Sequence, residues 1–491
     1  MIKNFLKFLI KNSIKLLLFL FVILFLIILF RGYSFVNNGL QIEPWHLEST
    51  IEEPIYQNYN SFEEYKKAEK IFLDTSYNLV KLKEKKLFNR YSLESQSSPY
   101  IKNTQFNSTG EPIPTELRGI NINESFKIIP KTKIKGGVLL LHGLTDSPYS
   151  QRDLANIFLE EGYVVLSLRY PYHGTQPGEM LKIKHEDWEK LIVYGIKLLK
   201  DELKEIKNPE IILSGYSTGG PISLNYILKQ IKNKAELPNK VFWFSPAMGV
   251  TPFAKIGFLD IALSKFPYFD KFKWLEIEPE FDGGKYTSFT KNAGIEVSKL
   301  ITENNKLLKK LTSKEKEKFP PIYIYQSLVD DTVDHKSIFK VNQTLGNPSG
   351  ELVIFDVNRK FNDFFTFSVQ NSTIEKITTE FPTKSTLTFL SNINSENPEV
   401  FQSKNGILQK KKFTPPLMWE PFSVSLAHIS LPISPANYHY GKNALLGNLN
   451  MKGEKEILTV SSGDISRLRY NQFFDYLKFS IKNNLRKEKK L

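Results

Sequence analysis

The first pattern along the chain is an unbroken apolar run near its start. Leu16–Phe30 contains fifteen apolar residues in succession, and four basic residues precede it, namely Lys3, Lys7, Lys11 and Lys15. The run alone makes a helix of about 22 Å, and flanking uncharged residues extend it toward the roughly 30 Å of a bilayer core. We expect residues 1–31 to be an uncleaved, single-pass membrane anchor, with a cytoplasmic N-terminus and the rest of the chain on the extracytoplasmic side. A cleaved signal peptide is the alternative, but no A-x-A-like site follows the run.

A different pattern begins near residue 134, where short apolar runs alternate with amphipathic stretches. The runs predict buried strands at 137–141, 163–168, 210–214, 241–244, 321–325 and 352–355. The amphipathic stretches between several of these strands predict helices. In the first predicted helix, between the strands at 137–141 and 163–168, Leu154, Ile157 and Phe158 share one face, and Gly162 ends the helix. Strands that alternate with helices predict an α/β fold, in which a mainly parallel sheet has helices on both faces.

Other segments precede or interrupt this alternation. Ser61 and Glu64 form a capping box that predicts a helix from Phe62 to Leu87, and residues 91–116 have the composition of a linker. Residues 247–318 are rich in aromatic side chains, and residues 358–420 have no regular pattern. We therefore divide the chain into a membrane anchor (1–31), an extracytoplasmic N-terminal segment with linker (32–133), a core in three parts (134–246, 319–357 and 421–480), two insertions (247–318 and 358–420) and a basic tail (481–491).

Composition narrows the possible function classes. The chain has 491 residues, no cysteine and a net charge of +14. Without cysteine there is no disulfide, thiolate metal site or thiol nucleophile. A nucleic-acid binder gathers its positive charge on one folded face, whereas residues 1–31 and 478–491 carry +5 each and the 446 residues between them carry only +4. We expect no nucleic-acid partner and a solvated basic tail, with contact to anionic lipid as the less favoured role of that tail.

The strongest chemical signal is the G-x-S-x-G pattern formed by Gly215, Ser217 and Gly219. It stands between a predicted strand and a predicted helix, where the two glycines allow a sharp turn that presents a serine nucleophile. The dipole of the following helix favours negative charge at that serine. The pattern alone arises by chance about 0.2 times in a chain of this length, so its companions decide the interpretation.

The first companion is the His142–Gly143 pair, which follows the predicted strand at 137–141. In this setting the loop after Gly143 supplies a backbone N–H to an oxyanion hole. The two donors would be the N–H groups of Leu144 and Thr218. We expect His142 itself to be a structural residue of the loop and not a base.

The second companion is an acid. Asp330 and Asp331 follow the predicted strand at 321–325, and Asp334 stands close behind them. A carboxylate at this point can accept a hydrogen bond from a histidine and so fix its tautomer. We favour Asp330 over Asp331 and Asp334; the plain alternative is an acidic, solvated turn.

The third companion is one of seven histidines. The chain order in this architecture is serine, acid, histidine, which leaves His335, His428 and His439. His335 is too near the acid and begins a predicted helix, while His439 lies in an Asn-Tyr-His-Tyr-Gly loop. His428 follows the last core strand and the second insertion, and we favour it as the base.

The remaining patterns add no cofactor. His185 would begin a zinc motif only if position 189 were histidine, but that residue is Glu189. Ser337 and Lys340 have S-x-x-K spacing without the companion motifs of that class. We expect no metal and no organic cofactor.

These motifs together resemble the α/β-hydrolase superfamily. Within it, they are most similar to the serine-hydrolase branch of monoacylglycerol lipases, lysophospholipases and bacterial carboxylesterases, of the membrane-anchored bacterial type. The resemblance spans about residues 130–480. It rests on HGLTDSP (142–148), YPYHG (170–174), GYSTGG (215–220), SLVDDTV (327–333), SLAHISLP (425–432) and, within the first insertion, PEFDGGKYTSF (279–289).

The resemblance implies a triad of Ser217, Asp330 and His428, with Leu144 and Thr218 as the oxyanion-hole donors. It also implies a lid at residues 247–318. One departure is the 98 positions between Asp330 and His428, where relatives often have a few dozen residues; the insertion at 358–420 would account for the difference.

We therefore expect a membrane-anchored serine hydrolase that cleaves carboxylic esters through an acyl-enzyme. The anchor and the aromatic insertion favour lysolipids or monoacylglycerols as substrates. A serine aminopeptidase is the alternative within enzymes, because a fold does not decide the substrate. A non-catalytic, membrane-tethered binding protein on a hydrolase scaffold is the alternative outside them. The oligomeric state is left open.

Overall fold

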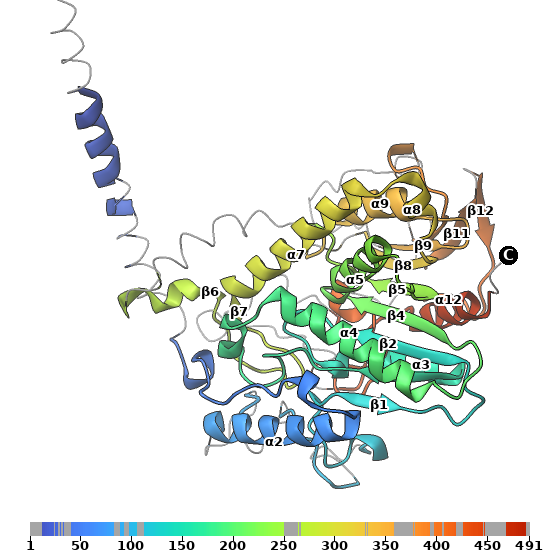
Figure 1. Ribbon diagram of the computed structural model, residues 1–491, viewed down its shortest axis with the longest axis horizontal. Coiled ribbons are helices and arrows are strands. Elements are labelled where there is room, and N and C mark those ends of the chain that lie inside the picture. The colour runs from blue at the N-terminus through green and yellow to red at the C-terminus, as the bar shows by residue number, and fades with distance from the viewer. Residues whose placement is uncertain are drawn as a thin grey trace, which may run out of the picture.

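A ten-stranded sheet runs through the middle of the protein, and helices cover both of its faces (Figure 1). The computed structural model describes residues 12–23, 25–27, 30, 33, 41–82, 89–92, 98–105, 112–249, 264, 267–328, 330, 332–357, 377, 379–392, 397–404, 407–418, 426–444, 446 and 468–487.

The strand order across the sheet is β1-β3-β2-β4-β5-β8-β9-β10-β11-β12. The strands are β1 (Phe126–Ile128), β2 (Gly136–Leu141), β3 (Tyr163–Ser167), β4 (Glu210–Tyr216), β5 (Lys240–Phe244), β8 (Ile322–Ser327), β9 (Glu351–Asp356), β10 (Thr386–Ser391), β11 (Glu399–Lys404) and β12 (Ile407–Lys411). The strands from β3 to β10 in this order are parallel, while β1, β11 and β12 pair antiparallel at the two edges. The expected α/β fold with a mainly parallel sheet is confirmed.

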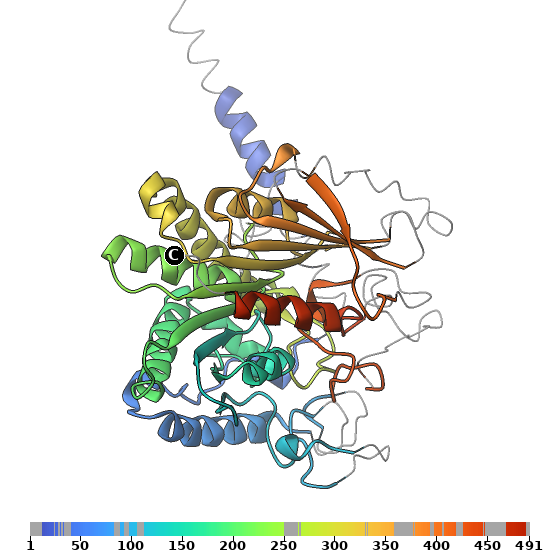
Figure 2. The same cartoon turned by 90° about the vertical axis from the view of Figure 1, so that its right-hand side faces the viewer.

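The helices form two layers. Helices α3 (Arg152–Glu160) and α12 (Phe474–Arg486) lie on one face; α4 (His185–Glu202), α5 (Gly219–Asn233), α7 (Lys291–Lys310) and α9 (His335–Leu345) lie on the other (Figures 1 and 2). The remaining regular elements are α2 (Phe62–Val80), α8 (Ser313–Glu317), the hairpin β6 (Trp274–Glu276) and β7 (Phe289–Thr290), and the 3₁₀ helices η1 (Pro44–His46), η2 (Tyr56–Asn58), η3 (Thr115–Leu117), η4 (Pro148–Gln151), η5 (Pro177–Leu181), η6 (Pro267–Lys273) and η7 (His428–Ser430).

The sequence of strand β2 is an unbroken apolar run because both faces of the strand are buried. Successive side chains of a strand point to opposite faces. Val138 and Leu140 therefore pack with α3 and α12, while Leu139 and Leu141 pack with α4 and α5. Because both faces are covered, no position on this strand faces water and the alternation of polar residues disappears.

Described residues of the N-terminal segment (32–133) belong to the folded body. Strand β1 joins the main sheet beside β3, and α2 ends at Val80, before the expected Leu87. Helix α2 is fastened to the core by Glu69, which accepts a 3.0 Å hydrogen bond from Arg169 Nε with both side chains fully buried.

The second insertion and the tail also contain regular structure. The insertion at 358–420 supplies β10, β11 and β12, which extend the sheet beyond β9. The expected basic tail overlaps α12, which continues to Arg486. Two of its basic side chains pair with acids at the end of α3: Lys482 Nζ lies 2.5 Å from Oε2 of Glu160, the last residue of the helix, and Arg486 Nη2 lies 2.6 Å from the C-cap residue Glu161. The first residues of this segment are therefore structural.

The described residues between 12 and 33 are helical and stand clear of the body in Figure 1. Their large apolar side chains are exposed; Leu17 is 66% and Phe21 is 67% accessible. Among the residues that the structure describes, no helix has both the length and the apolar character needed to cross a bilayer. The membrane anchor stays a prediction.

Candidate active site

The predicted site residues follow strands that end at the same edge of the sheet. In the β2–β4 pair Leu141 lies opposite Gly215, and in the β5–β8 pair Phe244 lies opposite Tyr325. Parallel strands in this register bring their carboxyl ends together, and open α/β sheets bind ligands at that edge. The loop after β2, the turn after β4 and the loop after β8 are thereby neighbours.

Ser217 sits on a strained turn between β4 and α5. Its φ is +50°, a left-handed conformation that a non-glycine residue adopts at a cost of about 1–3 kcal/mol. The surrounding backbone holds it there: Ser217 N–H donates to Phe244 O at 2.9 Å, while Ser217 O accepts from the N–H groups of Gly220 and Ala247, each at 3.0 Å. The turn leaves the serine partly exposed at the sheet edge, which is the geometry of a nucleophile elbow.

The elbow glycines are required by close packing. A Cβ atom on Gly215 would lie 2.4 Å from Gly219 O, and one on Gly219 would lie 2.2 Å from Leu141 O. Neither glycine has a positive φ. The positions two residues before and two residues after Ser217 must be glycine because the start of α5 touches both β4 and β2.

The loop after β2 packs directly against the elbow. A Cβ atom on Gly143 would lie 3.3 Å from Ser217 Cβ, and Asp146 N–H closes a turn onto Gly143 O at 3.3 Å. Within the described part of the chain, neither Leu144 N–H nor Thr218 N–H donates to a protein acceptor. Both groups are therefore available to an anion beside Ser217, as an oxyanion hole requires.

His142 occupies a structural position in this loop. Its Nδ1 lies 2.8 Å from Gly143 O, and its Nε2 accepts from Tyr170 N–H at 3.1 Å. An imidazole that donates at one nitrogen and accepts at the other is neutral, and burial also lowers its pKa well below the usual value. With both nitrogens engaged, His142 is not free to act as a base, in agreement with our expectation.

His428 and Asp330 face one another although 98 positions separate them in the chain. His428 Nδ1 lies 3.6 Å from Asp330 Oδ1, and the two side chains are 7% and 0% exposed. Asp330 Oδ1 also accepts from Thr332 N–H at 2.9 Å and from Val333 N–H at 3.2 Å. The histidine–acid distance exceeds a hydrogen bond, but catalytic hydrogen bonds often tighten only when substrate binds.

Two side chains at this site have no recognised role in the sequence motifs. The Tyr216 ring lies parallel to the His428 ring, with centroids 6.4 Å apart and planes 19° apart, and so brings the histidine beside the elbow. Gln326 Nε2 donates to Asp330 Oδ2 at 3.4 Å. Tyr216 occupies the first variable position of G-x-S-x-G, and Gln326 lies inside a strand, so neither stands out in the sequence. The structure brings Ser217, Leu144, Thr218, Asp330 and His428 to one region; their catalytic roles stay predictions.

The alternative residues serve other purposes where they are described. Asp334 caps α9 by accepting from Lys336 N–H at 3.0 Å, and His335 is the first residue of that helix. His439 is buried beside Asp282, and burial lowers its pKa. Asp331 lies outside the described residues.

Among the described residues, two overlapping groups of acids around His185 have a spacing that would suit a cation: Glu189 with Glu303, and Glu186 with Glu296. His185 Nδ1 lies 2.7 Å from Glu296 Oε2, and Glu189 and Glu303 are close to the same imidazole. Lys229 Nζ already lies 2.7 Å from Glu189 and 3.1 Å from Glu303. The charges are therefore balanced within the protein, and the cluster joins α4 to α7.

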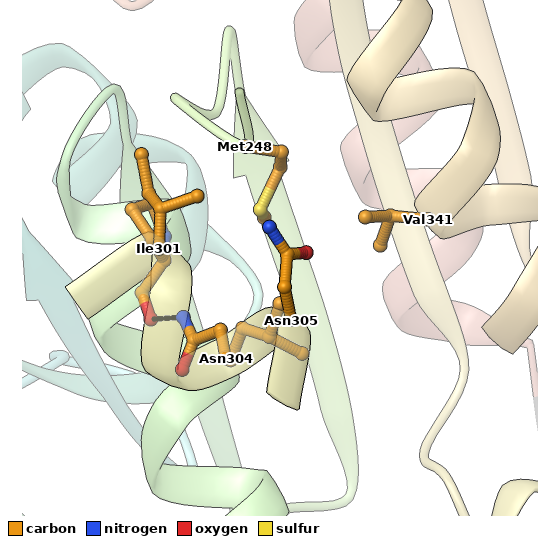
Figure 3. A pocket seen from close by; sticks show the side chains of 7 residues that line it. Met248, Ile301, Asn304, Asn305 and Val341 are labelled. Atoms are coloured by element: carbon orange, nitrogen blue, oxygen red, sulfur yellow. Dashed lines mark hydrogen bonds between the residues drawn. The ribbon is translucent and has the colours of Figure 1, made fainter. Parts of the chain in front are cut away.

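A small hollow lies between α5, α7 and α9 (Figure 3). Met248, Ile301, Asn304, Asn305 and Val341 line it, with Pro221 and Leu224 from α5. It is too narrow to admit a water molecule, so it does not hold an acyl chain. Most of the aromatic stretch of the expected lid lies outside the described residues, and Phe272 and Trp274 from its described part are buried. The lid stays a prediction.

Comparison with known proteins finds relatives over part of the chain, whereas no protein-family model matches it. A thermostable monoacylglycerol lipase of Bacillus sp. (strain H-257) is 35% identical over 88 residues, and a carboxylesterase of Bacillus subtilis (strain 168) is 39% identical over 93 residues. Each match covers 18% of this chain, which spans only about a third of the length of these relatives (33% and 36%).

Solved structures that match part of the chain include two lipases. The monoacylglycerol lipase of Paleococcus ferrophilus has a TM-score of 0.33 and 18% identity, covering 45% of this chain and 85% of that one. A soluble variant of monoglyceride lipase from Saccharomyces cerevisiae has a TM-score of 0.34 and 17% identity, covering 47% and 81%. The two partial sequence matches support the lipase- and esterase-like hydrolase superfamily that the motifs resemble.

Proposed function

We propose that this protein is a membrane-anchored serine hydrolase that cleaves carboxylic esters, with lysolipids or monoacylglycerols as its substrates. The observation that carries the proposal is the left-handed φ of Ser217 at the carboxyl end of β4. A strained serine between a strand and a helix persists only where the surrounding structure imposes it, and such strain gathers at active sites.

In the proposed reaction Ser217 Oγ attacks the ester carbonyl while His428 takes its proton. Because His428 Nδ1 faces Asp330, Nε2 is the nitrogen that would exchange the proton with Ser217. The oxyanion of the tetrahedral intermediate would be stabilised by Leu144 N–H and Thr218 N–H, each worth about 2.7–4 kcal/mol in comparable sites. His428 then protonates the leaving alcohol, and water attacks the acyl-enzyme by the same route.

The anchor and the location of the enzyme are part of the same proposal. The helical residues near the N-terminus expose apolar side chains on all sides, among them Leu17 and Phe21. Water disfavours a contiguous apolar surface of this kind, whereas a bilayer accommodates it. The lysines before it favour a cytoplasmic N-terminus and an extracytoplasmic hydrolase. An enzyme anchored to a bilayer in this way would have lysolipids and monoacylglycerols as the nearest ester substrates.

The test is covalent labelling of the full chain, in a mild non-ionic detergent, with a fluorophosphonate probe and hydrolysis of p-nitrophenyl esters of increasing chain length. We expect wild type to label and Ser217→Ala not to label. Asp330→Asn should lower kcat by about 10⁴-fold, because the histidine loses the carboxylate that fixes its tautomer. Asp334→Asn is the matched control, since asparagine still caps α9. A folded wild-type chain that neither labels nor hydrolyses any ester would refute the enzyme and leave a tethered binding protein as the better account.

A further inference from the structure

The oxyanion loop is held in place from outside the parallel core. Tyr286 N–H donates to Thr145 O at 2.9 Å, immediately after the Leu144 peptide. The preceding residue, Lys285, places its Nζ 3.7 Å from Asp146 Oδ2. Thr145 has a φ of +65°, so the turn is strained and depends on such contacts to persist. Residues 280–288, inside the stretch where the lid was expected, therefore contact both residues that follow Leu144.

This segment is itself fixed by buried charges from distant parts of the chain. Arg90, 1% exposed, donates from Nη1 to Asp282 O at 3.0 Å and to Lys285 O at 3.1 Å. The Asp282 carboxylate accepts from Tyr440 Oη and from Arg469 Nη1, each at 2.6 Å. Charge-assisted hydrogen bonds of this length are the strong ones. A rigid segment can hold a strained neighbour, whereas a mobile one cannot.

The ammonium group of Lys285 interacts with Asp146, a residue of the oxyanion loop itself. Its side chain is 23% exposed and that of Asp146 is 9% exposed. Asp146 Oδ2 lies 2.7 Å from the point where a Cβ on Gly143 would stand, so the carboxylate packs against the first residue of the turn. A cation at Lys285 keeps this carboxylate charged and in position despite its burial.

We propose that Lys285 is a positioning residue that, through Asp146 and with the Tyr286 backbone, aims Leu144 N–H at the oxyanion. This inference rests on the proposed function, since an oxyanion hole has a role only in acyl transfer. Lys285 acts on the transition state without touching the substrate, so its loss lowers kcat and leaves KM unchanged.

The experiment compares Lys285→Met, Lys285→Arg and Asp146→Asn in the full-length enzyme, with Lys299→Met as control. Lys299 is a lysine of α7 that pairs with Glu296 at 2.6 Å and lies apart from the loop. The substrates are p-nitrophenyl acetate and butyrate, which carry no charged headgroup. We expect Lys285→Met to lower kcat about 10-fold at constant KM, a part of the 10²–10³-fold that loss of a whole donor costs. Arginine should restore most of it.

The pH dependence of kcat distinguishes a positioning role of the Lys285–Asp146 pair from a general loss of folded structure. Burial raises the pKa of Asp146 to about 6; Lys285 and Arg469 oppose this rise and Asp282 adds to it. Above this pKa the ion pair exists, and below it the neutral carboxyl resembles asparagine. The ratio of wild-type to Asp146→Asn kcat should therefore fall toward one between pH 8 and pH 5.

The outcomes are distinct. An inactive, unlabelled wild type refutes the proposed function, and this inference with it. An active wild type whose kcat is unchanged in both Lys285→Met and Asp146→Asn refutes the inference alone. An effect on KM only, or one confined to substrates with an anionic headgroup, would make Lys285 a substrate-binding residue. Asp146→Asn is nearly isosteric, so it carries the test if Lys285→Met does not fold.

Discussion

Replacing Glu69 with alanine tests whether the N-terminal segment belongs to the cooperative body of the enzyme. Glu69 is fully buried on α2 and accepts from Arg169 Nε at 3.0 Å, Ser125 Oγ at 2.7 Å, Ser125 N–H at 2.8 Å and Tyr65 Oη at 3.1 Å. Arg169 is also fully buried, and its other charged partner is Glu53. Alanine would leave these donors without an acceptor in a region that water does not reach.

Removing one partner of a buried ion pair typically costs about 3–5 kcal/mol. We expect Glu69→Ala to fall in this range, because the lost contacts join α2 to the loop after β3. The matched control is Glu63→Ala on the same helix. Glu63 is 63% exposed and pairs with Lys127 at 2.9 Å, and an exposed pair of this kind contributes about 0.2–1 kcal/mol.

The assay is urea unfolding of the full chain in detergent, followed by tryptophan fluorescence and by circular dichroism. Coincident transitions by the two probes would establish two-state behaviour, and an unchanged m-value would assign the shift to stability. If Glu69→Ala and Glu63→Ala cost the same, about 1 kcal/mol or less, the segment is not part of the cooperative unit and our reasoning is wrong.

Two further predictions concern packing and pH. Gly219→Ala should cost about 1–3 kcal/mol of stability and most of the activity, because its Cβ would stand 2.2 Å from Leu141 O and force α5 off the sheet. Gly294→Ala in α7 is the control: its Cβ would meet only two ring atoms of Phe289, at 3.4 and 4.0 Å, so it should be neutral or stabilising. Equal effects of the two substitutions in unfolding and kcat assays would contradict this reasoning. The hydrogen bond with Glu296 raises the pKa of His185 above 6.5. Burial opposes a lower pKa for Glu296, but the hydrogen bonds from His185 and Lys299 lower it from 4.5 to about 2. The histidine contribution is complete below pH 6.5 and lost as pH rises through its raised pKa, whereas the carboxylate contribution is complete above pH 4.5 and lost toward pH 2. Glu296→Gln should therefore destabilise most between pH 4.5 and 6.5 and less at pH 8, and a loss of stability independent of pH would count against the pair.

The local parts of this protein could be predicted because each depends on neighbours in the sequence. The strands β2, β3, β4, β5, β8 and β9 are apolar runs, since both faces of each are covered by helices. The elbow at Ser217 is equally local: its strand, glycines and helix lie within a few residues of one another. His142 could be recognised as structural for the same reason, because its partners come from its own loop and a neighbouring strand end.

Other features could be decided only by the tertiary structure. Strand β1 has three residues, FKI, and β12 reads ILQKK. Neither is long enough or apolar enough to stand out as a core strand, because an edge strand gains much of its stability from the neighbour with which it pairs. His428 and Asp330 face one another across 98 positions of the chain, and Arg469 pairs with the distant Asp282. Both contacts depend on how distant segments pack. Sequence periodicity reports which side chains leave water, whereas the pairing of buried charges is set by the three-dimensional path of the chain. The sequence by itself therefore determined the core strands and the serine turn, and the tertiary structure decided which distant side chains surround them.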